Sequence, residues 1–161
     1  MPNKKGRVEM QDVHVKQVSF DNIDLSVLIA KLDAELLLKY PKEDIFGVDF
    51  EDPEIHKMTF VIAYCEGIAI GCGALRPLDP VSIELKRFFV DPSYRQRGIA
   101  SLILHFLEHE AIRKGYSILR LEAGLLQPEA IAMYTRFGYD EIERFGEYVD
   151  SKQSVCFEKR L

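Results

Sequence analysis

The stretch Val90-Asp91-Pro92-Ser93-Tyr94-Arg95-Gln96-Arg97-Gly98-Ile99-Ala100 decides how this chain is interpreted. An apolar run ends at Val90, a turn follows, and an amphipathic helix begins after Gly98. The first turn of a helix presents unpaired N–H groups and the positive end of its dipole, so it binds phosphate. A glycine lets the backbone approach such a ligand closely. The stretch therefore predicts a site for a pyrophosphate-bearing ligand, with an ordinary solvated loop as the alternative.

The charges around this stretch favour the same ligand. Lys86, Arg87, Arg95 and Arg97 cluster there with only Asp91 opposing them, although the whole chain carries a net charge of −5. That acidic balance disfavours a general nucleic-acid binder. The loop matches neither the P-loop pattern GxxxxGK(S/T) nor the dinucleotide fingerprint GxGxxG.

The strand before the loop, residues 82–90, changes its alternation part-way. Ile83 and Leu85 are apolar at odd positions, whereas Phe88 and Val90 are apolar at even positions. A phase shift of this kind is typical of a β-bulge. A bulge leaves backbone N–H and C=O groups unpaired, so we expect this strand to offer them to a ligand.

The rest of the chain predicts a mixed α/β domain. Helical spacing of apolar residues favours helices over residues 25–37, 98–115 and 128–138. Strands are expected over residues 8–20, 60–64, 68–75, 82–90, 117–123, 139–142 and 154–159, with a hairpin turn at Glu66-Gly67. We interpret residues 1–7 as a disordered tail and residues 8–161 as one domain.

Several classes of protein are disfavoured. No apolar run approaches the ~18 residues of a membrane helix, and the polar N-terminus does not resemble a signal peptide. Cys65, Cys72 and Cys156 form an odd set without a CxxC pair, which favours reduced, buried thiols and a cytoplasmic location. His105 and His109 share a helix face but lack a third ligand, so no metal site is expected.

Two motifs together resemble one family. Arg95-x-x-Gly98-x-Ala100 is similar to the pyrophosphate motif of the GNAT superfamily of N-acetyltransferases. Gln127-x-x-Ala130-x-x-x-Tyr134, followed by Gly138-Tyr139, resembles that family's second motif at the usual separation. The resemblance is to a bacterial, small-molecule-type member. It implies a single-domain GNAT fold, in which helices flank a mixed, partly splayed β-sheet.

The resemblance also implies acetyl-coenzyme A as the donor, with no metal. The pyrophosphate would sit on the loop and the helix start, formed by Arg95, Gln96, Arg97, Gly98, Ile99, Ala100 and the Ser101 hydroxyl. The pantetheine arm would pair like an extra strand with Phe88, Phe89 and Val90. Gln127 stands where the family has asparagine, so its contact with the pantetheine is expected to be shifted or to pass through water.

Two residues are implied in proton transfer. Tyr134 matches the family's general acid, which protonates the departing thiolate, and its alternative role is core packing. Glu84 lies on the bulged strand, where family members often place a base, and its alternative is an outward, solvated carboxylate. Direct attack within an oriented ternary complex, without a base, is also open.

The expected reaction is transfer of acetyl to a primary amine of a small molecule. Three alternatives stay open: a protein or peptide amine as acceptor, a non-catalytic acyl-coenzyme A sensor, and a nucleotide-binding regulator that uses the same anion site. A homodimer is suggested by analogy with the family. Six carboxylates in the segments expected around the acceptor favour a cationic acceptor, and the alternative is a solvated acidic loop. This acidic set consists of Glu43, Asp44, Asp49, Glu51, Asp52 and Glu147.

Overall fold

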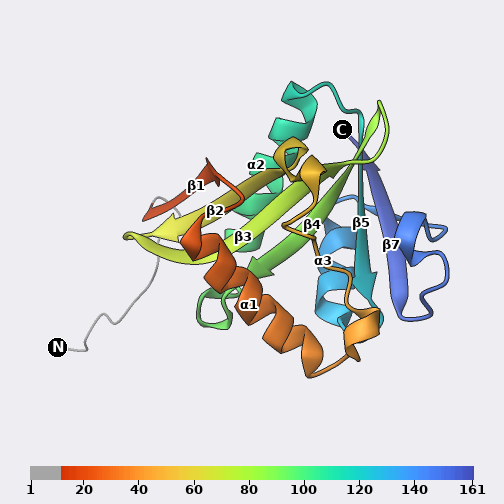
Figure 1. Ribbon diagram of the computed structural model, residues 1–161, viewed down its shortest axis with the longest axis horizontal. Coiled ribbons are helices and arrows are strands. Elements are labelled where there is room, and N and C mark those ends of the chain that lie inside the picture. The colour runs from red at the N-terminus through yellow and green to blue at the C-terminus, as the bar shows by residue number, and fades with distance from the viewer. Residues whose placement is uncertain (1–11) are drawn as a thin grey trace.

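Seven strands form one mixed sheet in the computed structural model, which describes residues 12–161 (Figure 1). The strands are β1 (Val13–Val18), β2 (Thr59–Cys65), β3 (Ile68–Pro77), β4 (Ser82–Val90), β5 (Ile118–Gly124), β6 (Asp140–Ile142) and β7 (Ser154–Arg160). The helices are α1 (Ile23–Leu37), α2 (Ile99–Arg113) and α3 (Pro128–Arg136), with 3-10 turns η2 (Lys42–Asp44), η3 (Pro53–Lys57), η4 (Pro92–Tyr94) and η5 (Gly146–Tyr148). The order across the sheet is β1-β2-β3-β4-β5-β7-β6.

Helices α1 and α2 cover opposite faces of the sheet (Figure 1). On one face α2 buries Ile103 and Leu107 completely, and on the other α1 buries Leu25, Leu28 and Leu32. Each such side chain stabilises the fold by roughly 1.5–3 kcal/mol when it leaves water. The two cores hold β4 between them, so its position is fixed from both sides.

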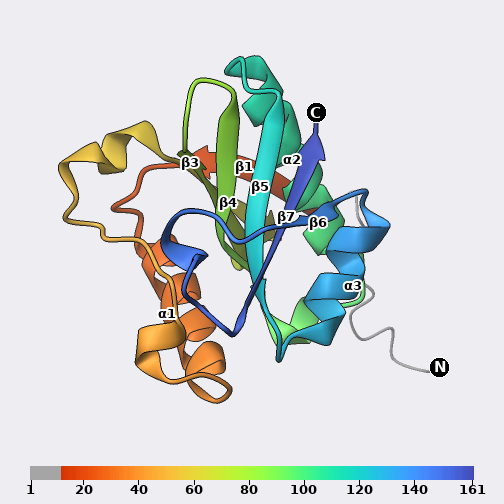
Figure 2. The ribbon, with the colours of Figure 1, turned by 90° about the vertical axis from the view of Figure 1, so that its right-hand side faces the viewer.

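The sheet opens between β4 and β5, the pair of neighbouring strands that run parallel. They pair only over Ser82–Glu84 and Ile118–Arg120. Beyond that point β4 continues with β3 as far as Val90, while β5 continues with β7 as far as Gly124. Figure 2 shows the two strands side by side at the centre of the molecule. The predicted mixed, partly splayed sheet is confirmed.

The predicted bulge in β4 is also confirmed. Cys72 lies opposite Phe89 and Ala74 opposite Lys86, so β4 carries one more residue than β3 over this span. Arg87 lies within this bulge and adopts a left-handed backbone conformation, with φ of 51°. Because the bulge shifts the alternation, Phe89 packs in the core beneath α1, while Phe88 packs against the core beneath α2.

The expected helices and strands agree in outline with those of the described residues. Glu66 and Gly67 form the β2–β3 turn with positive φ, and β3 extends two residues beyond its predicted end at Leu75. The predicted tail, residues 1–7, lies outside the described residues. Within residues 12–161, no helix is long and apolar enough to cross a membrane.

Candidate active site

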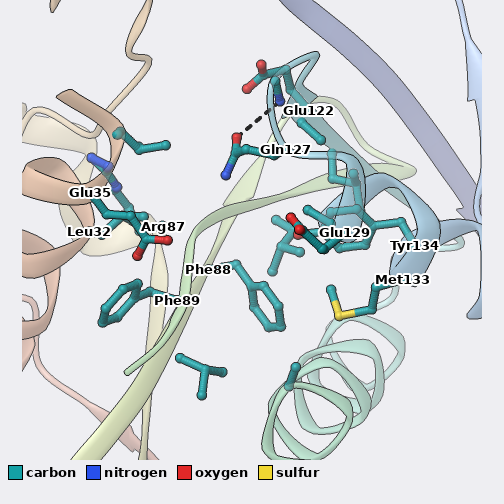
Figure 3. Close-up of a pocket in the computed structure, with 18 of the residues that line it drawn as sticks. Leu32, Glu35, Arg87, Phe88, Phe89, Glu122, Gln127, Glu129, Met133 and Tyr134 are labelled. Atoms are coloured by element: carbon teal, nitrogen blue, oxygen red, sulfur yellow. Dashed lines mark hydrogen bonds between the residues drawn. The ribbon is translucent and has the colours of Figure 1, made fainter. Parts of the chain in front are cut away.

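A cavity of about 910 Å³ occupies the opening between β4 and β5. Its walls come from α1, the β4 bulge, the start of α2, the end of β5, and α3. Figure 3 shows Glu35 and Arg87 on one side of it, Glu129, Met133 and Tyr134 on the other, and Phe88 between them. The cavity therefore gathers residues that are far apart in the sequence, from Leu32 to Gln153.

One end of the cavity is the loop before α2, residues 95–101, which we call the anion end. Gln96 and Gly98 both have positive φ, 59° and 80°, which turns the backbone into the helix. The first amides of a helix have no intrahelical acceptor, so they can receive an anion at this end. Gly98, Ala100 and Ser101 line the cavity here, and their role in binding a pyrophosphate stays a prediction.

Arg95 also lines the cavity, but its guanidinium is already engaged. Its Nη1 and Nη2 donate to the two carboxylate oxygens of Glu35 at 3.0 and 2.6 Å, and its Nε donates to the Val90 carbonyl at 2.8 Å. Arg97 does not line the cavity, and its guanidinium lies 5.7 Å from the centre of the Tyr94 ring. Within residues 95–101, the cavity is thus lined by an arginine that already has a carboxylate partner and by the start of α2.

The edge of β4 forms the middle of the cavity. Phe88, Phe89 and Val90 all line it, and none of them pairs with β5, because the two strands have already separated. An edge of this kind offers backbone N–H and C=O groups to an extended ligand.

Tyr134 lies on α3 across from this edge. Its ring packs 6.2 Å from that of Phe88 and 5.9 Å from that of Tyr139, and only 6% of the residue is exposed. Its hydroxyl has no hydrogen-bond partner among the described residues, and it lines the cavity. Burial, helped by the nearby charge of Glu122, raises the pKa of Tyr134, so it stays a neutral proton donor at pH 7.

Glu84, predicted as the base, is completely buried and does not line the cavity. Its carboxylate accepts hydrogen bonds from Arg76 at 2.8 Å and from the Tyr148 hydroxyl. The alternative of an outward, solvated carboxylate is therefore wrong, because the β6–β7 connection covers this part of the sheet. Its role as base stays a prediction.

Glu84 belongs to a closed ring of hydrogen bonds, which we call the charge ring. Arg76 donates to both Glu84 and Glu147. Lys86 donates to Glu147 and to the Tyr148 hydroxyl, at 2.8 Å each. The Tyr148 hydroxyl in turn donates to Glu84, which closes the ring. Burial alone would raise the pKa of Glu147, but the hydrogen bonds and charges of Lys86 and Arg76 lower it overall. The ring contains two cations and two carboxylates, so it is neutral as a unit.

Glu122 on β5 is the site residue that the sequence interpretation missed. It lines the cavity and has no cation partner within residues 12–161. Burial raises its pKa to about 7; a hydrogen bond from Ser154 and the charge of Lys86 oppose this rise, while Glu84 and Glu147 add to it. The signal was present, because Leu119 and Leu121 alternate with polar residues and put Glu122 on the face away from the core.

Gln127 lines the cavity where β5 leads into α3. Its Oε1 accepts a hydrogen bond from the Gly124 N–H at 3.3 Å, and its side-chain nitrogen points into the cavity (Figure 3). The Tyr40 hydroxyl accepts from the Leu126 N–H at 2.9 Å and closes this side. The longer amide thus braces the turn and still presents a donor.

The region expected to bind the acceptor is less acidic than the sequence suggested. Of the acidic set named above, only Asp44 lines the cavity, and Glu147 belongs to the charge ring. Phe46 lines it too and packs edge-on against Tyr148, with ring centres 4.9 Å apart. Among the described residues, no group of three or more potential ligands is placed to hold a metal ion.

Known proteins resemble this chain in both sequence and fold. A sequence model described as "Acetyltransferase (GNAT) family" matches residues 29–139. An IAA acetyltransferase from Azospirillum brasilense is 34% identical over 135 residues, covering 83% of this chain and 88% of that protein. A Klebsiella pneumoniae structure assigned as an acyl-CoA N-acyltransferase has a TM-score of 0.82 at 29% identity, covering 92% and 97% of the two chains. A GNAT family acetyltransferase from Elizabethkingia anophelis, crystallised with acetyl-CoA bound, shares the fold with a TM-score of 0.70 at 18% identity, covering 93% and 99%.

Proposed function

We propose, since the chain belongs to the GNAT acetyltransferase family, that it moves an acetyl group from acetyl-coenzyme A to a primary amine of a small molecule. One observation carries the proposal. A single cavity joins a helix N-terminus, an unpaired strand edge and two groups suited to proton transfer, Tyr134 and Glu122. Anion binding, extended-chain binding and acid–base chemistry are the three tasks that this reaction requires.

The donor would lie along the β4 edge. The α2 amides from Gly98 to Ser101 would hold its pyrophosphate, because they combine free N–H groups with the helix dipole. The backbone of residues 88–90 would pair with its pantetheine amides, as a strand pairs with an added strand. The Gln127 side-chain nitrogen would supply one further donor from the opposite wall.

In the reaction, the amine nitrogen attacks the thioester carbonyl carbon, so a C–N bond forms and the C–S bond breaks. Glu122 would accept the proton that the amine loses, since a carboxylate with a pKa of about 7 is matched to that task near neutrality. Tyr134 would give its hydroxyl proton to the departing sulfur. The proton on Glu122 would then restore Tyr134, which returns both groups to their starting state.

Glu122 suits the base better than Glu84 for two reasons. It lines the cavity, whereas Glu84 lies behind it. The Glu84 carboxylate is also already engaged in the charge ring, where it accepts hydrogen bonds from Arg76 and Tyr148. Direct attack without any base is the competing mechanism.

A closed acceptor region supports a small acceptor over a protein chain. Phe46 meets Tyr148 above β4, and the Lys86 ammonium donates to the Phe46 carbonyl at 3.5 Å, so the two loops lie together. Tyr40 closes the side next to β5 through its bond to Leu126. A protein or peptide acceptor would need an open groove here.

The test is a calorimetric titration of the purified protein with acetyl-coenzyme A, followed by thiol-release assays over a panel of amines. Binding together with thiol release on small amines supports the proposal. Release only with peptide amines would favour the protein acceptor, and binding without any release would favour a sensor. If acetyl-coenzyme A does not bind, the assignment of the anion end is wrong.

A further inference from the structure

Two ion pairs, one turn apart on the helix, join α1 to the segment between β4 and α2. Lys31 pairs with Asp91 at 2.9 Å, and Glu35 pairs with Arg95 at 2.6 Å. In Figure 3 the Glu35 carboxylate projects from α1 into the cavity. An acidic side chain thus stands beside the site that would receive the most negatively charged part of the donor.

The Glu35 carboxylate and the Val90 carbonyl together engage three of the five N–H groups of the Arg95 guanidinium. Both oxygens of Glu35 accept from it, the Val90 carbonyl accepts from Nε, and the guanidinium lies 5.6 Å from the centre of the Phe89 ring. A bidentate pair of this geometry is the strongest arrangement that arginine forms with a carboxylate. A bidentate contact of Arg95 with a pyrophosphate would therefore require it to release Glu35 or the Val90 carbonyl.

We propose that Glu35 is a positioning residue that keeps Arg95 from gripping the pyrophosphate and so weakens the binding of coenzyme A. This inference rests on the proposed function. The cation is neutralised in place, and the carboxylate adds repulsion toward an incoming phosphate. The amides of α2 then bind the pyrophosphate without a guanidinium clamp, which lets the product coenzyme A leave after transfer.

The experiment measures the dissociation constant of coenzyme A by calorimetry for the full chain and for single and double variants. Glu35→Gln is expected to tighten binding about threefold to tenfold, because Arg95 gains a phosphate partner close to solvent. The gain is expected to vanish when Glu35→Gln is combined with Arg95→Ala. Arg95→Ala alone is expected to change the constant less than about twofold, since Arg95 is already neutralised.

Two controls separate this role from a general effect of charge or of tethering. Glu110→Gln removes the same charge from another Glu–Arg pair, the one with Arg113 on α2, and should leave binding unchanged. Lys31→Gln breaks the other tether between α1 and the loop, and should not tighten binding.

The outcomes distinguish a failure of the role proposed for Glu35 from a failure of the proposed acetyltransferase function. If the unchanged protein binds coenzyme A but Glu35→Gln binds it equally or more weakly, Glu35 is a structural tether and the inference is wrong. A loss of tenfold or more in Arg95→Ala alone would also overturn it, because Arg95 would then be a phosphate ligand. If the unchanged protein does not bind coenzyme A, the proposed function itself fails.

Discussion

The two ends of the cavity are built in different ways. The anion end is a continuous piece of backbone, residues 95–101, and its cavity-lining Arg95 is paired with Glu35. The acid–base end, formed by Tyr134, Glu122 and the charge ring behind it, consists of side chains from β3, β4, β5, α3 and η5.

The difference predicts how each end responds to substitution. Amide groups remain when a side chain is replaced, so the anion end should tolerate most changes that preserve the turn. Side chains that share a buried hydrogen-bond network depend on one another, so their losses should be large and not additive.

The largest expected effect is on the acid–base end, in Glu122→Gln. Removal of a general base costs about a thousandfold in kcat, whereas the affinity for acetyl-coenzyme A should hold. The measurement is the pH profile of kcat, whose acidic limb near pH 7 should disappear. If Glu84→Gln removes that limb and Glu122→Gln does not, the base is Glu84.

Tyr134→Phe should lower kcat about a hundredfold with little change in the dissociation constant of acetyl-coenzyme A. The phenyl ring keeps the packing against Phe88 and removes only the hydroxyl. Tyr116 also packs against the core, so Tyr116→Phe is the matched control and should keep full activity. Equal losses in both variants would point to packing in place of proton transfer.

Lys86→Met tests the charge ring through stability. It leaves Glu147 and the Tyr148 hydroxyl without their shared cation, at a cost of about 2–3 kcal/mol in the free energy of unfolding. Urea denaturation measures this value. Lys31→Met, which breaks a more exposed ion pair at the other end, should cost less than about 1 kcal/mol. If the two variants lose similar free energies of unfolding, the charge ring contributes no more to stability than the exposed ion pair does.

The raised pKa of Glu122 predicts a pH dependence of stability. The folded state holds this proton up to about pH 7, whereas the unfolded chain loses it near the ordinary value of 4.5. The stabilising contribution is therefore complete below pH 4.5 and is lost as pH rises through 7. Relative to Glu122→Gln, the unchanged protein should lose about 1–2 kcal/mol between pH 4.5 and pH 8, after allowance for partial exposure. A pH-independent difference would show that Glu122 titrates normally.

The smallest effect is expected at the anion end. Arg97 does not line the cavity, so Arg97→Ala should change the dissociation constant of coenzyme A by less than about twofold at physiological salt. A change of tenfold or more would mean that side chains contribute to this end as much as backbone does.

The same contrast explains what the sequence could predict. The bulge in β4 appears as a shift in alternation around Lys86-Arg87, and the anion end appears as a turn ending at Gly98; both are local patterns. Residues 88–90, expected to pair with the pantetheine, line the cavity, and that pairing stays a prediction.

The acid–base end is not local, so the sequence could not show which carboxylate faces the cavity beside Tyr134. Glu84 and Glu122 both look like outward carboxylates on strands. Only the covering of β4 by η5, more than sixty residues away, makes one of them a buried ring member and leaves the other in the cavity. No spacing along the chain encodes the pairing of Lys86 with Glu147.

The three cysteines have a consequence for redox chemistry. Cys65, Cys72 and Cys156 are all buried free thiols, and burial raises the pKa of Cys72 to about 12. Thiol–disulfide exchange needs a thiolate that is accessible, and these side chains offer none at neutral pH. The proposed reaction releases coenzyme A, itself a thiol that oxidises to a disulfide. Such a disulfide would find no partner sulfur on this protein, so the catalyst would stay unmodified as its own product accumulates and oxidises.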